Sequence, residues 1–151
     1  MQYMIKKADP LDASEISQLA SVSKASWGYD DSFMATVKDE LSYTAQDIAK
    51  HPTYLVKFNN EILGFYQLRS VDEITVELEA LFVKPNAMGK CLGQSLFMHA
   101  SAQAKKSFKT MLIESDPFAE TFYLKQGCIR VGEKPSLNIP GRSLPLLHFL
   151  L

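Results

Sequence analysis

The sequence predicts an α/β (α+β) fold, with a mixed, mostly antiparallel sheet of about seven strands and helices on both faces. Amphipathic helix patterns alternate with strand patterns along the chain. Three strand patterns follow one another with short turns between them, as in an antiparallel meander. A strand, a helix and a further strand then occur at about residues 75–114, which is typical of a right-handed parallel crossover. With 151 residues, the chain is expected to form a single domain over residues 1–151.

The first third of the chain is expected to hold one strand and several helices. These lie at residues 3–9, from Asp12 to near Gly28, and, as one or two short helices, within 30–41 and 44–51. Apolar residues at helical spacing define the first helix, at Ile16, Leu19, Ala20 and Val22. Asp12 is expected to cap this helix, because Glu15 follows at the capping-box spacing.

The remaining elements complete the expected sheet. Three strands are predicted at 53–58, 61–71 and 74–83, and Gly64 in the second indicates a bulge or a close backbone approach. A long helix is expected at about 92–107, with its apolar face at Leu92, Leu96, Phe97, Ala100 and Ala104. A buried strand at 109–115 and a short helix within 116–127 follow, the helix beginning at Asp116–Pro117 and ending at Gly127. Strands at 128–133 and 143–151 close the chain.

Composition excludes several classes of function. Sixteen Lys and Arg balance 17 Asp and Glu, so no nucleic-acid partner is expected. The N-terminus lacks a signal-peptide core, and the C-terminal apolar run is too short to span a bilayer, so we expect a cytoplasmic protein without a membrane partner. Cys91 and Cys128 are expected to be free thiols, and the three scattered histidines predict no metal site.

The stretch "MGKCLG" precedes the long helix and is the first candidate binding site. Main-chain N–H groups at a helix start have no partner within the helix and attract anions, and glycines let the chain wrap closely. Gly89 and Gly93 therefore suit a phosphate or pyrophosphate, with Lys90 adding a cation and Ser95 a hydroxyl. A plain tight turn is the alternative. The spacing matches neither the Walker A loop nor the dinucleotide fingerprint.

The residues around this turn resemble the GNAT acetyltransferase superfamily. "LFVKP" followed by "MGKCLGQSL" is similar to its acetyl-CoA-binding motif, "ESDPFAETFYLKQGC" to its fourth-helix segment, and "GEKPSLNIPGRSLPLLHFLL" to the closing segment of one subgroup. The resemblance covers residues 54–151 well and residues 1–50 in outline. The chain departs from the family pattern at Met88 and Cys91 in the turn, and at Phe118 and Cys128 beyond it.

The resemblance implies acetyl-CoA as co-substrate, with its diphosphate at Gly89–Gly93 and its pantetheine arm beside main chain near Leu81 and Val83. The implied cofactor-binding residues are Leu81, Phe82, Val83, Met88, Gly89, Lys90, Cys91, Leu92, Gly93, Gln94, Ser95, Asp116 and Phe118. Strand alternation places Glu77, Glu79, Leu81 and Val83 on one face of their strand.

Two residues are predicted to be catalytic in N-acetyl transfer. Glu79 is a candidate general base for the ammonium substrate, with a solvated or ion-paired strand glutamate as the alternative. The resemblance makes Tyr123 the general acid that protonates the leaving thiolate, and a core tyrosine is the alternative. Glu77, Trp27, Tyr29 and Phe33 are candidates for binding the acceptor, although the three aromatic residues would also suit a core cluster.

These observations predict an enzyme, an N-acetyltransferase that acts on a primary amine of a small molecule or peptide by direct attack in a ternary complex. The acceptor is not identified by the sequence. Met88 and Cys91 leave open a non-catalytic CoA-binding regulatory module, and a pure interaction domain is a third reading. The apolar last strand is expected to allow pairing into a homodimer.

Overall fold

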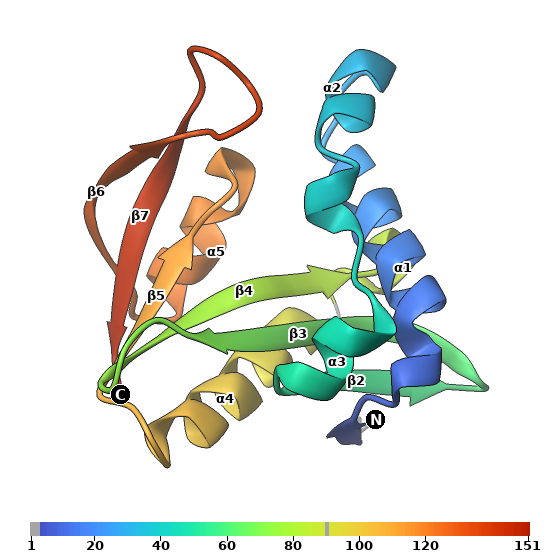
Figure 1. Cartoon of the computed structure of the whole chain (residues 1–151), viewed down its shortest axis with the longest axis horizontal. Helices are drawn as coiled ribbons and strands as arrows, with labels where there is room; N and C mark the ends of the chain where they lie inside the picture. Colours follow the sequence, from blue (N-terminus) through green and yellow to red (C-terminus); the bar gives the residue numbers. More distant parts are fainter. Residues whose placement is uncertain (1–3, 90) are drawn as a thin grey trace.

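The computed structural model describes residues 4–89 and 91–151, and in them seven strands form one open mixed sheet (Figure 1). The strand order is β1-β2-β3-β4-β5-β7-β6. The strands are β1 (Ile5–Lys7), β2 (Thr53–Phe58), β3 (Glu61–Ser70), β4 (Thr75–Val83), β5 (Thr110–Glu114), β6 (Ile129–Pro135) and β7 (Ser143–Leu150). Only β4 and β5 pair in parallel, which confirms the predicted meander and crossover.

Helices cover both faces of the sheet, as predicted. They are α1 (Ala13–Ala25), α2 (Asp31–Thr36), α3 (Ala45–Lys50), α4 (Leu92–Lys105) and α5 (Glu120–Lys125). In Figure 1, α1 and α3 lie on one side of β2–β4 and α4 lies on the other. Short 3₁₀ turns lie at η1 (Pro10–Asp12), η2 (Asp39–Leu41), η3 (Pro85–Ala87) and η4 (Pro117–Ala119).

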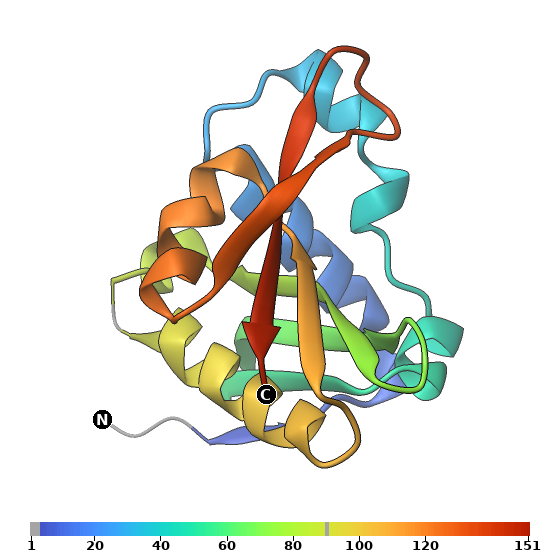
Figure 2. The same cartoon turned by 90° about the vertical axis from the view of Figure 1, so that its left-hand side faces the viewer.

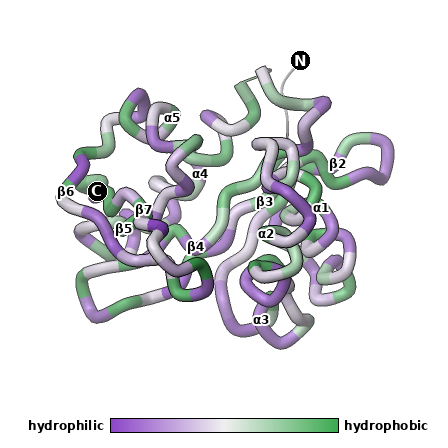
Figure 3. The backbone as a smooth tube through the Cα atoms, turned by 90° about the horizontal axis from the view of Figure 1, so that it is seen from above, coloured by the Kyte–Doolittle hydropathy of each residue, from purple (hydrophilic) through white to green (hydrophobic). Residues whose placement is uncertain are grey.

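Two hydrophobic cores hold these layers together. One lies between the sheet and α4 and includes Tyr66, Leu96 and Met111, all with no exposed surface. The other lies between the sheet and α1 and includes Ile16, Leu55 and Phe65, which are equally buried. Figure 3 shows hydrophobic and hydrophilic residues alternating along the elements, as amphipathic layers require.

The start of α1 differs from the prediction. The Asp12 side chain does not cap α1, and instead accepts a hydrogen bond from the Asp9 main-chain N–H at 2.9 Å. Asp9 and Asp12 thus form a capping box one turn earlier, around η1. Glu15 accepts a hydrogen bond from the Ile62 main-chain N–H at 2.8 Å, so its carboxylate ties α1 to β3. The capping-box spacing is thus used by Asp9 and Asp12, one turn before the predicted position. Glu15 is not part of a capping box because its carboxylate bonds to β3.

The last strand does not lie at an edge of the sheet. Figure 2 shows β7 running between β5 and β6, and it pairs antiparallel with both along its length. Its main-chain groups are therefore used within the chain, so β7 has no free edge that could extend the sheet into a second copy, and the homodimer stays a prediction. The edges of the sheet are β1 and β6.

Strand β4 contains a bulge at Glu79. The residues Gln67 and Leu68 of β3 pair with Ala80 and Leu78 of β4, so Glu79 is an extra residue. The bulge reverses the side-chain alternation beyond it, because Leu78 and Val83 face the α4 core whereas Ala80 faces the α1 core. The predicted shared face of Glu77, Glu79, Leu81 and Val83 is therefore wrong.

None of the described helices is long and apolar enough to cross a membrane.

Candidate active site

The sheet opens between β4 and β5, and this opening holds a cavity of about 830 Å³. The two strands pair only from Thr75–Glu77 to Thr110–Leu112, just before the bulge, and then diverge (Figure 1). Beyond the last pair, β4 has a neighbouring strand on the β3 side alone. Because strand main-chain groups alternate sides, part of the N–H and C=O groups of residues 79–83 face the cavity without a strand partner.

The glycine turn and the start of α4 form one end of this cavity. Met88, Gly89, Cys91, Leu92, Gly93 and Gln94 all line it. The first N–H groups of α4 have no acceptor within the helix, and Cys91 supplies no side-chain cap. These amides and the helix dipole make the turn suitable for an anion. Lys90 lies outside the described residues.

The two glycines of the turn have different roles. Gly89 has a φ of 83°, and a Cβ there would meet no atom within 4 Å, so the turn needs its conformation and leaves open space beside it. Gly93 faces the ring of Phe122, which a Cβ would approach to 3.3 Å, so this glycine allows α4 to pack closely on α5. Cys91 has a left-handed φ of 59°, a conformation that glycine adopts more easily.

Tyr123 projects from α5 toward the same cavity. Its side chain lines the cavity although the residue is only 6% exposed. No described residue forms a hydrogen bond with its hydroxyl, and no fully buried side-chain polar atom in the described chain lacks a partner. The exposed part of Tyr123 therefore includes the hydroxyl. Burial, with the nearby Cys128 and Asp116, raises the pKa of Tyr123 well above its usual value, so the hydroxyl stays protonated.

Three glutamates line the cavity where β4 and β5 separate. Glu77 pairs in register with Leu112, so Glu114 lies two residues further along the neighbouring strand. Burial, a hydrogen bond with Glu114 and the nearby Glu79 charge raise the pKa of Glu77 to about 8. Burial also raises the pKa of Glu79, while Arg69 opposes this shift. Burial alone would raise the pKa of Glu114, but the hydrogen bonds from Glu77 and Lys134 lower it below its usual value.

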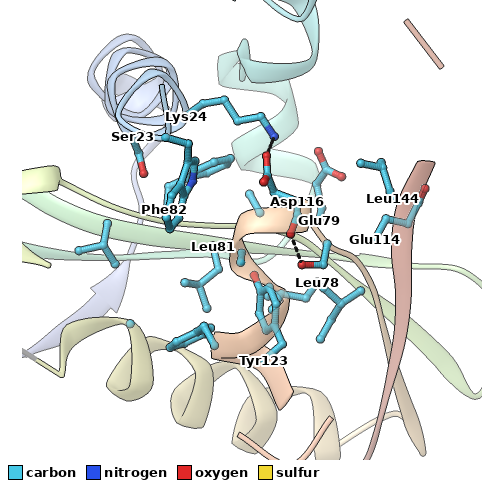
Figure 4. A pocket seen from close by; sticks show the side chains of 18 of the residues that line it. Ser23, Lys24, Leu78, Glu79, Leu81, Phe82, Glu114, Asp116, Tyr123 and Leu144 are labelled. Atoms are coloured by element: carbon cyan, nitrogen blue, oxygen red, sulfur yellow. Dashed lines mark hydrogen bonds and ion pairs between the residues drawn. The ribbon is translucent and has the colours of Figure 1, made fainter. Parts of the chain in front are cut away.

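Asp116 joins three distant segments above Tyr123. Its Oδ2 accepts hydrogen bonds from Lys24 Nζ at 2.5 Å, the Tyr29 hydroxyl at 2.9 Å and Arg142 Nη2 at 3.2 Å. In Figure 4, Lys24 reaches from α1 to Asp116, and Tyr123 lies below them on α5. Burial opposes ionisation of Asp116, but Lys24 and the other donors lower its pKa, so it is ionised. The Asp116 carboxylate therefore already has protein partners.

The predicted acceptor residues separate into two groups. Trp27 lines the cavity, whereas Tyr29 and Phe33 stack on each other at 3.9 Å and hold the Arg142 guanidinium over their rings. Phe118 is half-exposed and stacks on Trp27 at 5.7 Å. Phe118, Ser95, Tyr29 and Phe33 do not reach the described cavity wall.

Sequence reasoning missed several polar residues of the cavity wall, namely Ser23, Lys24, Glu40, Tyr43, Glu114, Ser115, Lys125, Gln126, Ser136 and Arg142. Tyr43 is 5% exposed, and its main chain is fixed on α1 by Ser17, whose Oγ accepts the Tyr43 N–H at 2.8 Å. Glu114 ends the strand that follows the crossover, and the carboxyl end of such a strand is a recurrent site position. For Lys24 and Tyr43 the sequence holds no comparable signal. Both cysteines are free thiols, as predicted.

A family model for the "Acetyltransferase (GNAT) domain" matches residues 20–138 of the chain. A search of curated proteins finds no match. Among solved structures, a GCN5-related N-acetyltransferase from Rhodopseudomonas palustris is 16% identical with a TM-score of 0.83, over 100% of this chain and 97% of that one.

Two further similar structures were solved with a ligand. The PaiA N-acetyltransferase from Thermoplasma acidophilum, in complex with coenzyme A, is 17% identical with a TM-score of 0.76 over 100% of both chains. YncA, a putative acetyltransferase from Salmonella typhimurium with acetyl-CoA, is 21% identical with a TM-score of 0.69, over 99% of this chain and 94% of that one. At these identities the structural similarity shows a shared fold.

Proposed function

The chain belongs to the acetyltransferase (GNAT) family, and from this premise we propose that it transfers the acetyl group of acetyl-CoA to a primary amine by direct attack in a ternary complex. It is thus an acyltransferase with acetyl-CoA as co-substrate. One observation carries the proposal: a single cavity joins the start of α4, the unpaired edge of β4 and the Tyr123 hydroxyl. Two proteins of similar fold were solved with coenzyme A or acetyl-CoA, which supports the same ligand here.

The described residues fit the two polar parts of coenzyme A. The N–H groups of Gly89 and of Cys91–Gln94 would hold the diphosphate, because they lie at the positive end of the α4 dipole and the first amides of a helix have no acceptor within it. The main-chain groups of Leu81–Val83 would hydrogen-bond the amides of the pantetheine arm, much as an added strand would. Bound acetyl-CoA then supplies the thioester carbon that the amine attacks.

Two side chains would move protons during the reaction. Glu79 accepts a proton from the ammonium group of the acceptor, directly or through water, which frees the lone pair that forms the C–N bond. As the C–S bond breaks, the Tyr123 hydroxyl donates its proton to the thiolate sulfur, and the tyrosinate regains a proton from the nitrogen of the new C–N bond. The hydroxyl is protonated at neutral pH, because burial raises a pKa that is already alkaline. Main-chain N–H groups of the β4 edge would stabilise the oxyanion.

Binding and turnover separate the parts of this proposal. We expect millimolar acetyl-CoA to raise the melting temperature, because a ligand that binds only the folded state stabilises it. In a thiol-release assay with primary amines, Tyr123→Phe should lower kcat about a hundredfold with little change in acetyl-CoA affinity. Tyr54→Phe is the matched control, because Tyr54 lies on β2 away from the cavity wall.

Each negative result has a distinct meaning. Acetyl-CoA binding without transfer to any amine would leave a CoA-binding module as the better description. The absence of both binding and transfer would reject the co-substrate. A Tyr123→Phe variant with unchanged turnover would remove the proposed proton donor while leaving acetyl transfer intact.

A further inference from the structure

We propose that the acceptor is a small diamine, with one ammonium group held by Glu79 and Tyr43 for transfer and the second held between Glu77 and Glu114. The inference rests on the proposed acetyl transfer and names the substrate class of that same cavity. It follows from the distribution of charge along the wall, from the arrangement of two carboxyl groups, and from one hydroxyl group without a partner.

Opposite charges occupy different parts of the cavity wall. Lys24 and Arg142 both bind Asp116 Oδ2, at 2.5 Å and 3.2 Å, so this group carries one net positive charge, and Lys125 of α5 adds another cation to the wall. Arg69, outside the wall, lies opposite Glu77 on β3 and partly offsets the carboxylates of β4. The β4–β5 side carries Glu77, Glu79 and Glu114, and η2 adds Glu40. A cationic acceptor would be attracted to this side and repelled by the other, which fixes its orientation.

Glu77 and Glu114 lie together in the cavity wall, and the raised pKa of Glu77 supports one proton between them when no cation is bound. The two carboxyl groups lie on adjacent strands at the point where β4 and β5 separate, because Glu77 pairs with Leu112 and Glu114 follows two residues later. Glu114 also binds Lys134 Nζ at 3.0 Å, on a lysine that is not part of the cavity wall. An ammonium group has three donors and would satisfy both carboxylates at once, which would let the shared proton leave.

Tyr43 gives an independent indication that a polar ligand belongs here. It is 5% exposed, and no described residue forms a hydrogen bond with its hydroxyl. Because no fully buried side-chain polar atom in the described chain lacks a partner, this hydroxyl must reach the cavity. Its ring is held edge-on against Phe65 at 5.4 Å, so the hydroxyl is fixed in position. A fixed, buried hydroxyl in the same cavity wall as Glu79 and Glu40 is suited to accept from an ammonium group.

The spacing favours a short acceptor. The main chains of Glu77 and Glu79 are at most about 7 Å apart, the separation in a regular strand, because the bulge at Glu79 can only shorten it. A chain of a few carbon atoms bridges this separation. The cavity of about 830 Å³ must also hold the pantetheine arm, which leaves limited room for a larger acceptor.

Three amines with the same four-carbon chain test the inference. Putrescine carries a second amine, n-butylamine a methyl group and γ-aminobutyrate a carboxylate. We expect kcat/KM for putrescine to exceed that for n-butylamine by about tenfold or more, with γ-aminobutyrate lowest. If n-butylamine reacts as well as putrescine, or γ-aminobutyrate reacts better, the inference is overturned while acetyl transfer stands.

Calorimetry tests the second ammonium site without chemistry. Putrescine is titrated into the enzyme–CoA complex at neutral pH in phosphate and in Tris, whose ionisation enthalpies differ. Wild-type protein should release protons on binding, because the ammonium group replaces the proton shared by Glu77 and Glu114. Binding without proton release, or no binding at saturating CoA, would contradict the proposal even if no amine were acetylated.

Glutamine variants show which carboxyl groups cause the preference for putrescine and the release of protons on binding. In Glu77→Gln the amide can still donate to Glu114, so the variant should fold but lose the proton release on putrescine binding. Glu114→Gln should reduce the putrescine to n-butylamine ratio to within about threefold of unity. Glu73→Gln, on an exposed turn outside the cavity wall, is the control and should leave that ratio unchanged. A ratio that is insensitive to Glu114→Gln would remove the second ammonium site.

Discussion

Replacing Glu77 by glutamine is expected to stabilise the protein at alkaline pH. Burial and the bond with Glu114 raise the pKa of Glu77 from 4.5 to about 8 in the folded state. The stability contributed by protonated Glu77 is fully present below the ordinary pKa, and it is lost as the pH rises through about 8. Glutamine resembles the protonated acid at every pH, so the variant should not lose this contribution.

The magnitude follows from the size of the shift. Each tenfold change in proton affinity corresponds to about 1.4 kcal/mol, so the shift sets an upper limit of about 5 kcal/mol. Glu77 is only half-buried, so solvent screens part of this energy, and Glu114, whose pKa is lowered, contributes with the opposite sign. We therefore expect the variant to be about 1–2 kcal/mol more stable than wild type at about pH 9, and equal to it at about pH 4.

Urea unfolding, followed by the fluorescence of Trp27, measures this difference. The free energy of unfolding is compared at acidic, neutral and alkaline pH for wild type, Glu77→Gln and the surface control Glu73→Gln. A difference between wild type and Glu77→Gln that stays constant with pH would refute the reasoning, because a constant difference cannot come from a titrating carboxyl group. Equal behaviour of Glu73→Gln and Glu77→Gln would refute it as well.

Three further predictions concern the base, the core and the buried ion pairs. Wild-type kcat/KM should rise with pH through a raised pKa of Glu79, and Glu79→Gln should lose that rise and about a hundredfold of activity, as a pH–rate profile would show. Gly64→Ala would place a Cβ 2.9 Å from Leu96 Cδ1, so chemical unfolding should show a loss of about 1–3 kcal/mol, and an unchanged midpoint would contradict it. Asp116→Ala should cost about 2 kcal/mol by leaving two partly buried cations without their carboxylate, and the wild-type protein should lose the same contribution as the pH falls through the lowered Asp116 pKa.

Local signals explain why the fold could be predicted. The short α5 begins after Asp116–Pro117, where Asp116 Oδ1 accepts from the Phe118 N–H at 2.8 Å, and Gly127 follows its end with a φ of 103°. These features depend on neighbouring residues, so the sequence contains them. The same holds for the turn before α4, where the need for unusual dihedrals shows in Gly89.

The parts of the site that escaped prediction depend on contacts between distant residues. A strict two-residue period placed Leu81 beside Glu79, but the register between β3 and β4 inserts Glu79 as a bulge and reverses the order. Asp116 and Lys24 are 92 positions apart, and neither has a local pattern that indicates the other. Tyr43 reads as an ordinary core residue until its position beside the opened sheet is known.

The brief pairing of β4 with β5 also divides the molecule mechanically. Within the described residues, three residue pairs between strands join β1–β4 to β5–β7, and the core beneath α4 also spans both parts of the sheet. A ligand bound in the cavity between β4 and β5 would contact both parts of the sheet. We therefore expect it to slow amide hydrogen exchange in both parts at once. The rigidity of the sheet is therefore expected to depend partly on the bound ligand. Without a ligand, β1–β4 and β5–β7 should move more freely relative to each other.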